Sequence, residues 1–199
     1  MLKKLLTKFH FYLGLFFLVD LWLFSLTGLF LNHPDWSVNE YRKESHWVET
    51  TESVTLAQSG DRFEKANYYL SELNLEGELS NVQEQENQFR FRVRRPRNEA
   101  QVTIHFDTGK VQLRKKSTDT YGVLNTLHIF NGMQRFDPGK EKLTWFATRL
   151  WVIAMDGLAV GLIVLVLTGC YMWSQTQKIV SGAVSLLLGL GTALVFLFL

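Results

Sequence analysis

The stretch "HFYLGLFFLVDLWLFSLTGLFLNH", residues 10–33, is an apolar run with a histidine at each end and one aspartate, Asp20, near its middle. Residues 11–31 are too long for the apolar core of a secretory signal and lack an Ala-x-Ala-like cleavage site. At about 1.5 Å per residue, a helix of this length covers roughly 30 Å, the thickness of the hydrocarbon core of a bilayer. We therefore predict a membrane-spanning helix with His10 and His33 near opposite membrane faces.

Two further apolar segments follow near the C-terminus. Residues 145–173 are interrupted by Arg149 and Asp156, and residues 179–199 carry no charge at all. Together with the first run, these segments predict a membrane α-helical fold with three transmembrane helices and the lipid bilayer as a partner.

The distribution of lysines predicts the orientation. Lys3, Lys4 and Lys8 precede the first span, and Lys178 lies between the last two. The positive-inside rule places both segments in the cytoplasm, so three spans send the C-terminus to the periplasm of a bacterial inner membrane. The expected segments are a basic cytoplasmic N-terminus (1–8), three transmembrane helices (9–32, 145–173 and 179–199), a periplasmic domain (33–144) and a cytoplasmic link (174–178).

The polar insert between the first two spans is predicted to be a small α+β domain. Apolar residues recur at three- and four-residue steps across residues 59–75, the periodicity of an amphipathic helix. "QFRFRVRR" (88–95) and "QVTIHF" (101–106) alternate apolar and polar residues, and the turn "DTGK" leads into the short strand "VQLRK". We expect a helix packed on an antiparallel meander of three or four strands.

Charge in this insert is balanced, with 16 Lys and Arg against 17 Asp and Glu over residues 32–144. That balance gives no nucleic-acid signature. Arg90, Arg92 and Arg94 alternate with apolar residues along one predicted strand. They form either a solvated outer face of the sheet or a site for an anion or an acidic partner.

Five short motifs together resemble the PepSY-associated transmembrane helix proteins of bacteria. They are "HFYLG" and "SLTGLFL" in the first span, the hairpin "VTIHFDTGKV", "LHIFNG" before the second span and "LTGCYMW" at its end. The resemblance covers most of residues 9–173. The hairpin looks like the last one of a PepSY module, in which an acidic residue precedes a Thr-Gly turn.

The resemblance implies an inner-membrane protein with a periplasmic PepSY-like domain. Some larger relatives are reductases that pass electrons through b-type haems to release iron from siderophores, so haem b and iron uptake are implied as options. This chain departs from them in having three spans and no Gly-rich nucleotide-binding motif. Electrons would then come from another protein or a quinol.

A b-type haem needs axial nitrogens from facing helices, and His10, His33 and His128 are the candidates. His10 and His33 are 23 residues apart, about 34 Å along a helix, so they cannot share one haem. His33 and His128 are both predicted at the outer face and would form a bis-histidine site. His10 would need a second copy of itself from a homodimer. No metal is expected beyond the haem iron.

The alternative for each of these histidines is an interfacial residue bonded to headgroups or backbone. Pro34 disfavours helical geometry in the preceding residue, so "NHP" is also explained as the end of a helix. Residues near 121–133 are predicted to form an amphipathic segment on the membrane surface. That segment keeps His128 near the outer leaflet whether or not a metal binds.

Three ionisable residues lie inside the spans. Asp20 and Asp156 are predicted at similar depth, where two carboxylates repel unless one is protonated or a cation intervenes. Arg149 lies two turns above Asp156 on the same helix face. The alternatives are contacts between helices, proton or cation handling beside a redox centre, and a neutral aspartate facing lipid.

Small residues predict close helix packing, because lipid gives no hydrophobic drive for association. Gly157 and Gly161 form a GxxxG step on the second span, and Ser185 and Gly189 belong to a small-residue ridge on the third. Their contacts lie within one chain, in a homodimer or in a larger membrane complex.

The leading hypothesis is a PepSY-type inner-membrane protein that acts as a b-haem-linked reductase component in ferric iron or siderophore uptake, or in periplasmic electron transfer. The competing hypothesis is a non-catalytic membrane subunit or assembly factor that holds a partner through its periplasmic domain. Whether the chain is itself an enzyme is left open by the sequence.

Overall fold

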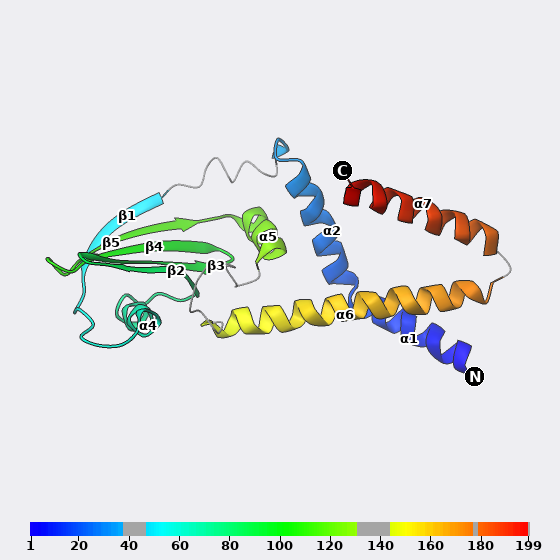
Figure 1. Cartoon of the computed structure of the whole chain (residues 1–199), viewed down its shortest axis with the longest axis horizontal. Coiled ribbons are helices and arrows are strands. Elements are labelled where there is room, and N and C mark those ends of the chain that lie inside the picture. The colour runs from blue at the N-terminus through cyan, green and yellow to red at the C-terminus, as the bar shows by residue number, and fades with distance from the viewer. Residues whose placement is uncertain (38–46, 131–143, 177–178, 199) are drawn as a thin grey trace. The chain divides into compact units, whose positions relative to one another are not determined.

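The computed structural model describes residues 1–37, 47–130, 144–176 and 179–198 (Figure 1). Lys178 and the end of the predicted 121–133 segment lie outside these residues. The chain divides into two compact units, one formed by residues 1–21 with 156–199 and the other by residues 22–155. Each unit is described by itself.

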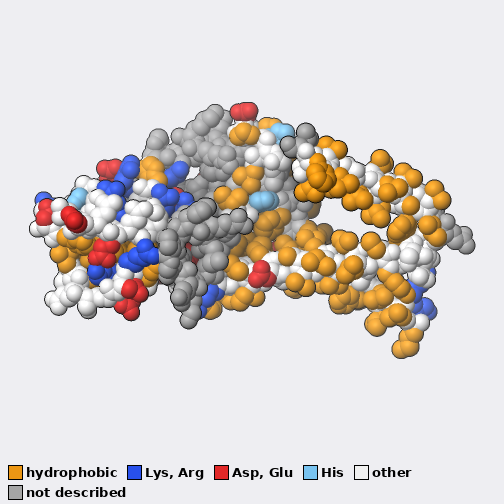
Figure 2. All heavy atoms as spheres, in the orientation of Figure 1, with side chains coloured by type: hydrophobic (Ala, Val, Ile, Leu, Met, Phe, Trp, Pro, Cys, Tyr) orange, Lys and Arg blue, Asp and Glu red, His pale blue; other side chains and the backbone are white. Residues whose placement is uncertain are grey.

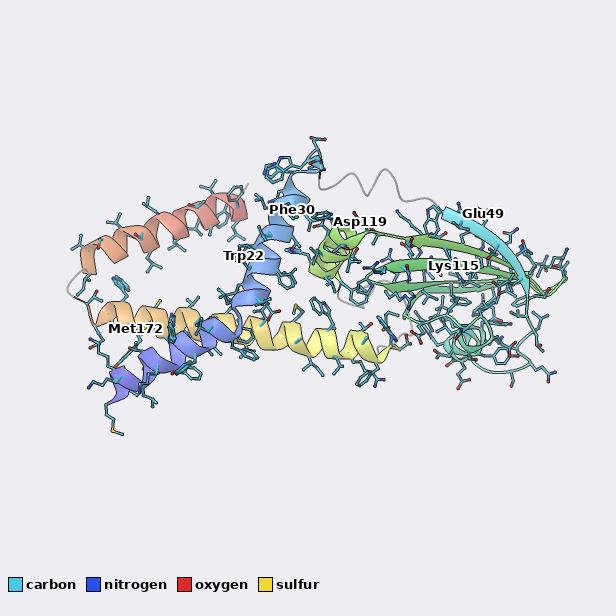
Figure 3. All side chains as sticks on the ribbon, turned by 180° about the vertical axis from the view of Figure 1, so that it is seen from behind. Trp22, Phe30, Glu49, Lys115, Asp119 and Met172 are labelled. Carbon is cyan, nitrogen blue, oxygen red and sulfur yellow. The ribbon has the colours of Figure 1, made fainter. Side chains whose placement is uncertain are left out.

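The first unit is helical. It contains α1 (Leu2–Phe16), the second half of α6 (Phe146–Ser174) and α7 (Ile179–Phe198). α1 runs along α6 in both ribbon views (Figures 1 and 3). His10 and Gly14 of α1, and Phe17 just after its last residue, contact α6; they lie at i, i+4 and i+7 and so share one face. They meet residues 168, 165 and 161 of α6 respectively, which is an antiparallel register.

The predicted first span is divided in two. α1 and α2 (Leu18–Asn32) are separated at Phe17 and bent by 53°. The hydrogen bonds across the break run from the Phe17 N–H to Leu13 and from the Leu21 N–H to Phe17. The hydropathy of a segment does not show whether its helix axis bends. The sequence therefore predicted one continuous helix.

α6 and α7 are each long and apolar enough to cross a membrane, and α1 with α2 adds a third span if the bent pair is counted as one. α6 has 29 residues and α7 has 20. Across the α6–α7 connection, the Trp173 indole packs on Gly182, where a Cβ atom would lie 1.9 Å from the indole nitrogen. The chain is therefore a membrane protein with an inserted domain.

The second unit carries a five-stranded antiparallel sheet with the order β1-β5-β4-β3-β2. The strands are β1 (Trp47–Ser53), β2 (Glu78–Gln85), β3 (Gln88–Arg95), β4 (Asn98–His105) and β5 (Lys110–Ser117). The sequence predicted three or four strands. β1 was missed because it is an edge strand, exposed from its second residue onward, and so lacks the alternation that marks a half-buried strand.

One face of the sheet is covered by α4 (Arg62–Glu72), as predicted from its periodicity (Figure 1). Asp61 begins this helix with a capping box, accepting from the Phe63 and Glu64 N–H groups while the Glu64 carboxylate accepts from the Asp61 N–H. The core between helix and sheet is closed by fully buried aromatic and aliphatic side chains. They include Tyr69, Phe89, Leu79, Ile104, Leu113 and Val111.

A buried carboxylate links the sheet to the start of α6. Glu78 is 2% exposed and accepts hydrogen bonds from the Thr144 N–H at 2.9 Å, the Thr144 hydroxyl at 3.1 Å and the Trp145 N–H at 3.0 Å. The Leu79 N–H donates to the Thr144 hydroxyl at 3.1 Å. The first turn of a helix has N–H groups without intrahelical partners, so an acceptor just before α6 stabilises its beginning.

Candidate functional site: two histidine–threonine pairs

His128 lies near the end of α5 (Thr120–Ile129), which begins at the capping residue Asp119. Its Nδ1 atom is 2.7 Å from the hydroxyl oxygen of Thr27 on α2. Thr27 is only 1% exposed, although it lies in an apolar helix. The hydrogen bond therefore holds the imidazole against a buried helix position that is 101 residues away in the chain.

The Thr27 hydroxyl determines which nitrogen of His128 carries the proton. It lies 2.7 Å from the Leu23 carbonyl oxygen, which can only accept. A hydroxyl has a single proton, so it donates to the carbonyl and accepts from the histidine. Nδ1 of His128 is then the donor in this contact, and in the neutral ring Nε2 carries the electron pair.

The His128 ring has a glycine beside one edge and an aromatic ring nearby. A Cβ atom on Gly28 would lie 3.4 Å from the ring Cε1 atom, so the glycine leaves room for the imidazole. The Phe24 ring lies 5.0 Å from the His128 ring, centroid to centroid. The Trp151 indole N–H donates to the Phe130 carbonyl at 2.9 Å, which ties the end of α5 to α6.

The helical unit repeats this arrangement with His10. Nδ1 of His10 is 2.8 Å from the Thr168 hydroxyl, which also lies 2.8 Å from the Val164 carbonyl oxygen. Thr168 is 8% exposed. The same proton count makes Nδ1 the donor, and in the neutral ring Nε2 carries the electron pair. Gly169 follows the threonine, and a Cβ atom there would lie 3.7 Å from the His10 Cε1 atom.

The comparisons place the chain in a family. All of residues 1–199 match the PepSY_TM-like family. The chain belongs to this family. Comparison with curated proteins and with solved structures found no match. The family supports a transmembrane PepSY protein, and the sheet with α4 fits an inserted PepSY-like domain.

His33 of this PepSY_TM-like protein lies just after α2, with its side chain exposed. Its ring stacks on Trp36 at 4.5 Å with an interplanar angle of 6°. The contacts described above join His128 to Thr27 and His10 to Thr168. The pairing of His33 with His128 on one iron stays a prediction.

The three charged residues of the spans are spread over different environments. Asp20 is half-buried in the first turn of α2, where a carboxylate is favoured by the helix dipole. Asp156 is exposed on α6. The Arg149 guanidinium lies 5.9 Å from the centroid of the Phe146 ring, one turn earlier in α6 and away from Asp156. Among the described residues, none of these three side chains forms an ion pair.

The small residues predicted to pack also have different surroundings. The Phe17 ring occupies the space beside Gly161, where a Cβ atom would lie 2.1 Å from that ring. Gly157 and Gly189 have no described atom within 4 Å of such a Cβ position. Ser185 donates to the Ser181 carbonyl at 3.1 Å within its own helix.

The sequence did not predict a role in the site for Thr27, Thr168 or Glu78. A signal was present for the threonines, since Leu-Thr-Gly occurs once in each of the first two predicted spans. Nothing in the chain order says that His128 meets the first of these motifs and His10 the second. Glu78 gave no signal, because it is one acidic residue among seventeen in the insert.

The donor chemistry of both pairs fits an axial ligand of haem iron. A ligating histidine needs a neutral ring with its second N–H held by another group, and the threonine hydroxyl provides that hold. In the part of the chain that the structure describes, no three His, Cys, Asp or Glu side chains gather into a site for a bare metal ion.

Proposed function

We propose that this PepSY_TM-like protein binds haem b and serves as an electron-transfer component in the uptake of ferric iron or siderophores. The observation that carries this proposal is the His128–Thr27 hydrogen bond of 2.7 Å, which uses Nδ1 and so leaves Nε2 of a neutral His128 ring for a metal. Haem, when bound, supplies a one-electron redox couple.

Each residue of the His128 pair has a defined task in this proposal. His128 would hold the haem iron through Nε2, Thr27 orients the ring through Nδ1, and Gly28 leaves space for the ring edge. His33 is the second residue proposed to hold the iron. His10, held by Thr168, is the corresponding donor of the helical unit, and its second ligand would come from another copy of the chain.

The proposed location is the bacterial inner membrane, with the bent α1–α2 pair counted as one of three spans. Lysines before α1 and in the link after α6 place those segments in the cytoplasm by the positive-inside rule. The C-terminus and the sheet domain then lie in the periplasm. The chain has no Gly-rich nucleotide-binding motif, so the proposed electron donor is a quinol or another protein.

The test is the pigment content of the protein purified in detergent from cells supplied with haem. We expect a Soret band, a reduced spectrum of a b-type haem, and loss of both in His128→Ala. His105→Ala is the matched control, because His105 lies on β4 of the sheet. A colourless wild-type protein would contradict the proposal, and so would equal haem in the His128→Ala variant and the wild type.

A second function is favoured by Asp156. This carboxylate is exposed on a helix that is otherwise apolar around it, and a charge inside the bilayer is unfavourable by about 2.5–3.5 kcal/mol on insertion scales. Contact with another membrane protein would remove Asp156 from lipid, as expected of a non-catalytic subunit or assembly factor. A haem-free protein that co-purifies with one stoichiometric partner, and loses it in Asp156→Leu, would support this alternative.

A further inference from the structure

The sheet face opposite α4 is polar and rich in arginine. Because directly paired residues of neighbouring strands point to the same side, the strand registers identify its members. Figure 2 shows Lys and Arg side chains on the sheet domain, interspersed with Asp and Glu. We call the centre of this surface the basic sheet face. It consists of Arg90, Arg92, Gln101, Thr103, Gln112 and Arg114.

Three guanidinium groups surround neutral hydrogen-bonding side chains on this face. Arg92 on β3 pairs with Gln101 on β4, which pairs in turn with Arg114 on β5. Strands lie about 4.8 Å apart, so the backbones of Arg92 and Arg114 are about 10 Å apart. Arg90 lies two residues from Arg92 along the same strand, about 7 Å away. Amide and hydroxyl groups of Gln101, Thr103 and Gln112 lie between them.

The arginines of this face retain free donor capacity. Glu99 contacts the Nε atom of Arg92 at 3.1 Å, and Glu49 contacts the Nε atom of Arg114 at 2.7 Å. A guanidinium has five N–H donors, so a contact at Nε leaves the terminal nitrogens for another acceptor. Arg90 donates to the Gln88 amide oxygen at 2.9 Å. Because this amide is neutral, the contact does not compensate the positive charge of Arg90.

The composition of the face indicates the kind of ligand. Protein-docking surfaces and membrane-inserting surfaces carry exposed aromatic or aliphatic side chains, and none of the six residues is apolar. The nearby aromatic residue on β1, Trp47, has its ring under the Arg114 guanidinium at 5.4 Å. Excess positive charge among amides and hydroxyls is suited to a small, hydrophilic, multiply charged anion.

We propose that the basic sheet face binds a small polycarboxylate anion, recognised by Arg90, Arg92 and Arg114 through charge-assisted hydrogen bonds. The identity of the bound anion rests on the proposed function. Under that function, the anion is a carboxylate chelate of ferric iron. Its iron is the electron acceptor, and the sheet domain holds it.

The experiment is a calorimetric titration of the full chain in nanodiscs with citrate and with gallium(III) citrate, at low ionic strength. We expect saturable binding that weakens by about tenfold in each of Arg92→Gln and Arg114→Gln, because each removes a charged pair with carboxylate. Binding should also weaken with added salt. Arg62→Gln is the control, because it removes the same charge from α4, where the Arg62 guanidinium lies over Phe63.

Four outcomes would overturn the proposal. They are the absence of saturable binding, an equal loss in the Arg62→Gln control, equal binding of a neutral gallium trihydroxamate, and arginine-dependent retention of anionic lipid without citrate binding. Melting temperatures of the variants verify that each one is folded. Gallium is not reduced and no haem signal is read, so failure of this titration and failure of the haem test are separate results.

Discussion

The two histidine–threonine pairs have the same hydrogen-bond chemistry in two different settings. In both, an imidazole Nδ1 meets a buried threonine hydroxyl that also bonds the carbonyl four residues earlier, and a glycine follows the threonine. His10 belongs to α1, a helix of the apolar unit, whereas His128 is carried on α5 beside the sheet domain.

The difference between the pairs lies in what else fixes the ring. His128 has an aromatic neighbour, Phe24, and a close glycine at 3.4 Å. His10 has the looser glycine contact at 3.7 Å and, within the described residues, no aromatic ring contact. The hydrogen bond is therefore the shared requirement, and aromatic packing makes His128 the better-fixed donor. Four predictions test this contrast.

Gly161→Leu should have the largest effect. Its Cβ atom alone would lie 2.1 Å from the Phe17 ring, so the substitution separates α1 from α6 and breaks the His10 pair in the same unit. Overpacking of this kind is destabilising by about 1–3 kcal/mol or more. We expect a lower melting temperature in detergent, with the haem signal of His128 retained. Gly157→Leu is the control, because Gly157 has open space around it.

Glu78→Ala should destabilise the start of α6, in the unit that carries His128. The change leaves the Thr144 and Trp145 N–H groups without their carboxylate acceptor at the start of α6. Bonds to a carboxylate contribute about 1.5–3 kcal/mol. Hydrogen exchange measured by mass spectrometry should rise in residues 144–150 and remain unchanged in α1. Equal exchange in the variant and the wild type would show that Glu78 does not hold this helix start.

Thr27→Val should weaken haem retention while leaving the fold intact. Valine keeps the shape of threonine but removes the oxygen that accepts from Nδ1 of His128. Loss of such a supporting bond lowers metal affinity by about 10- to 100-fold. Thr27→Ser should restore binding, and Thr168→Val should leave the His128 signal unchanged. Equal losses in the two valine variants would remove the distinction between the pairs.

Gly28→Ala and Gly169→Ala should have the smallest effects. The added methyl group meets the His128 ring at the edge of van der Waals contact and the His10 ring more loosely. We therefore expect a small shift in the haem absorbance maximum for Gly28→Ala and none for Gly169→Ala. A shift in the second variant alone would reverse the assignment of the better-fixed ring.

Much of the architecture was predictable from local pattern. The 3.6-residue period marked α4, and the alternation of Phe89, Phe91 and Val93 with arginines marked β3, because burial on one face leaves a periodic trace in the sequence. β1 left no such trace as an exposed edge. The break at Phe17 also left none, since apolar residues continue directly on both sides of it.

The order of residues is enough to predict apolar segments near both ends, a small α+β domain between them, and a few histidines and acidic residues within or beside those segments. The pairing of each histidine with its threonine, and the contact of Glu78 with the beginning of α6, became visible in the folded chain. The physical reason is that hydropathy and periodicity are properties of neighbouring residues, whereas these hydrogen bonds join positions 67 to 158 residues apart.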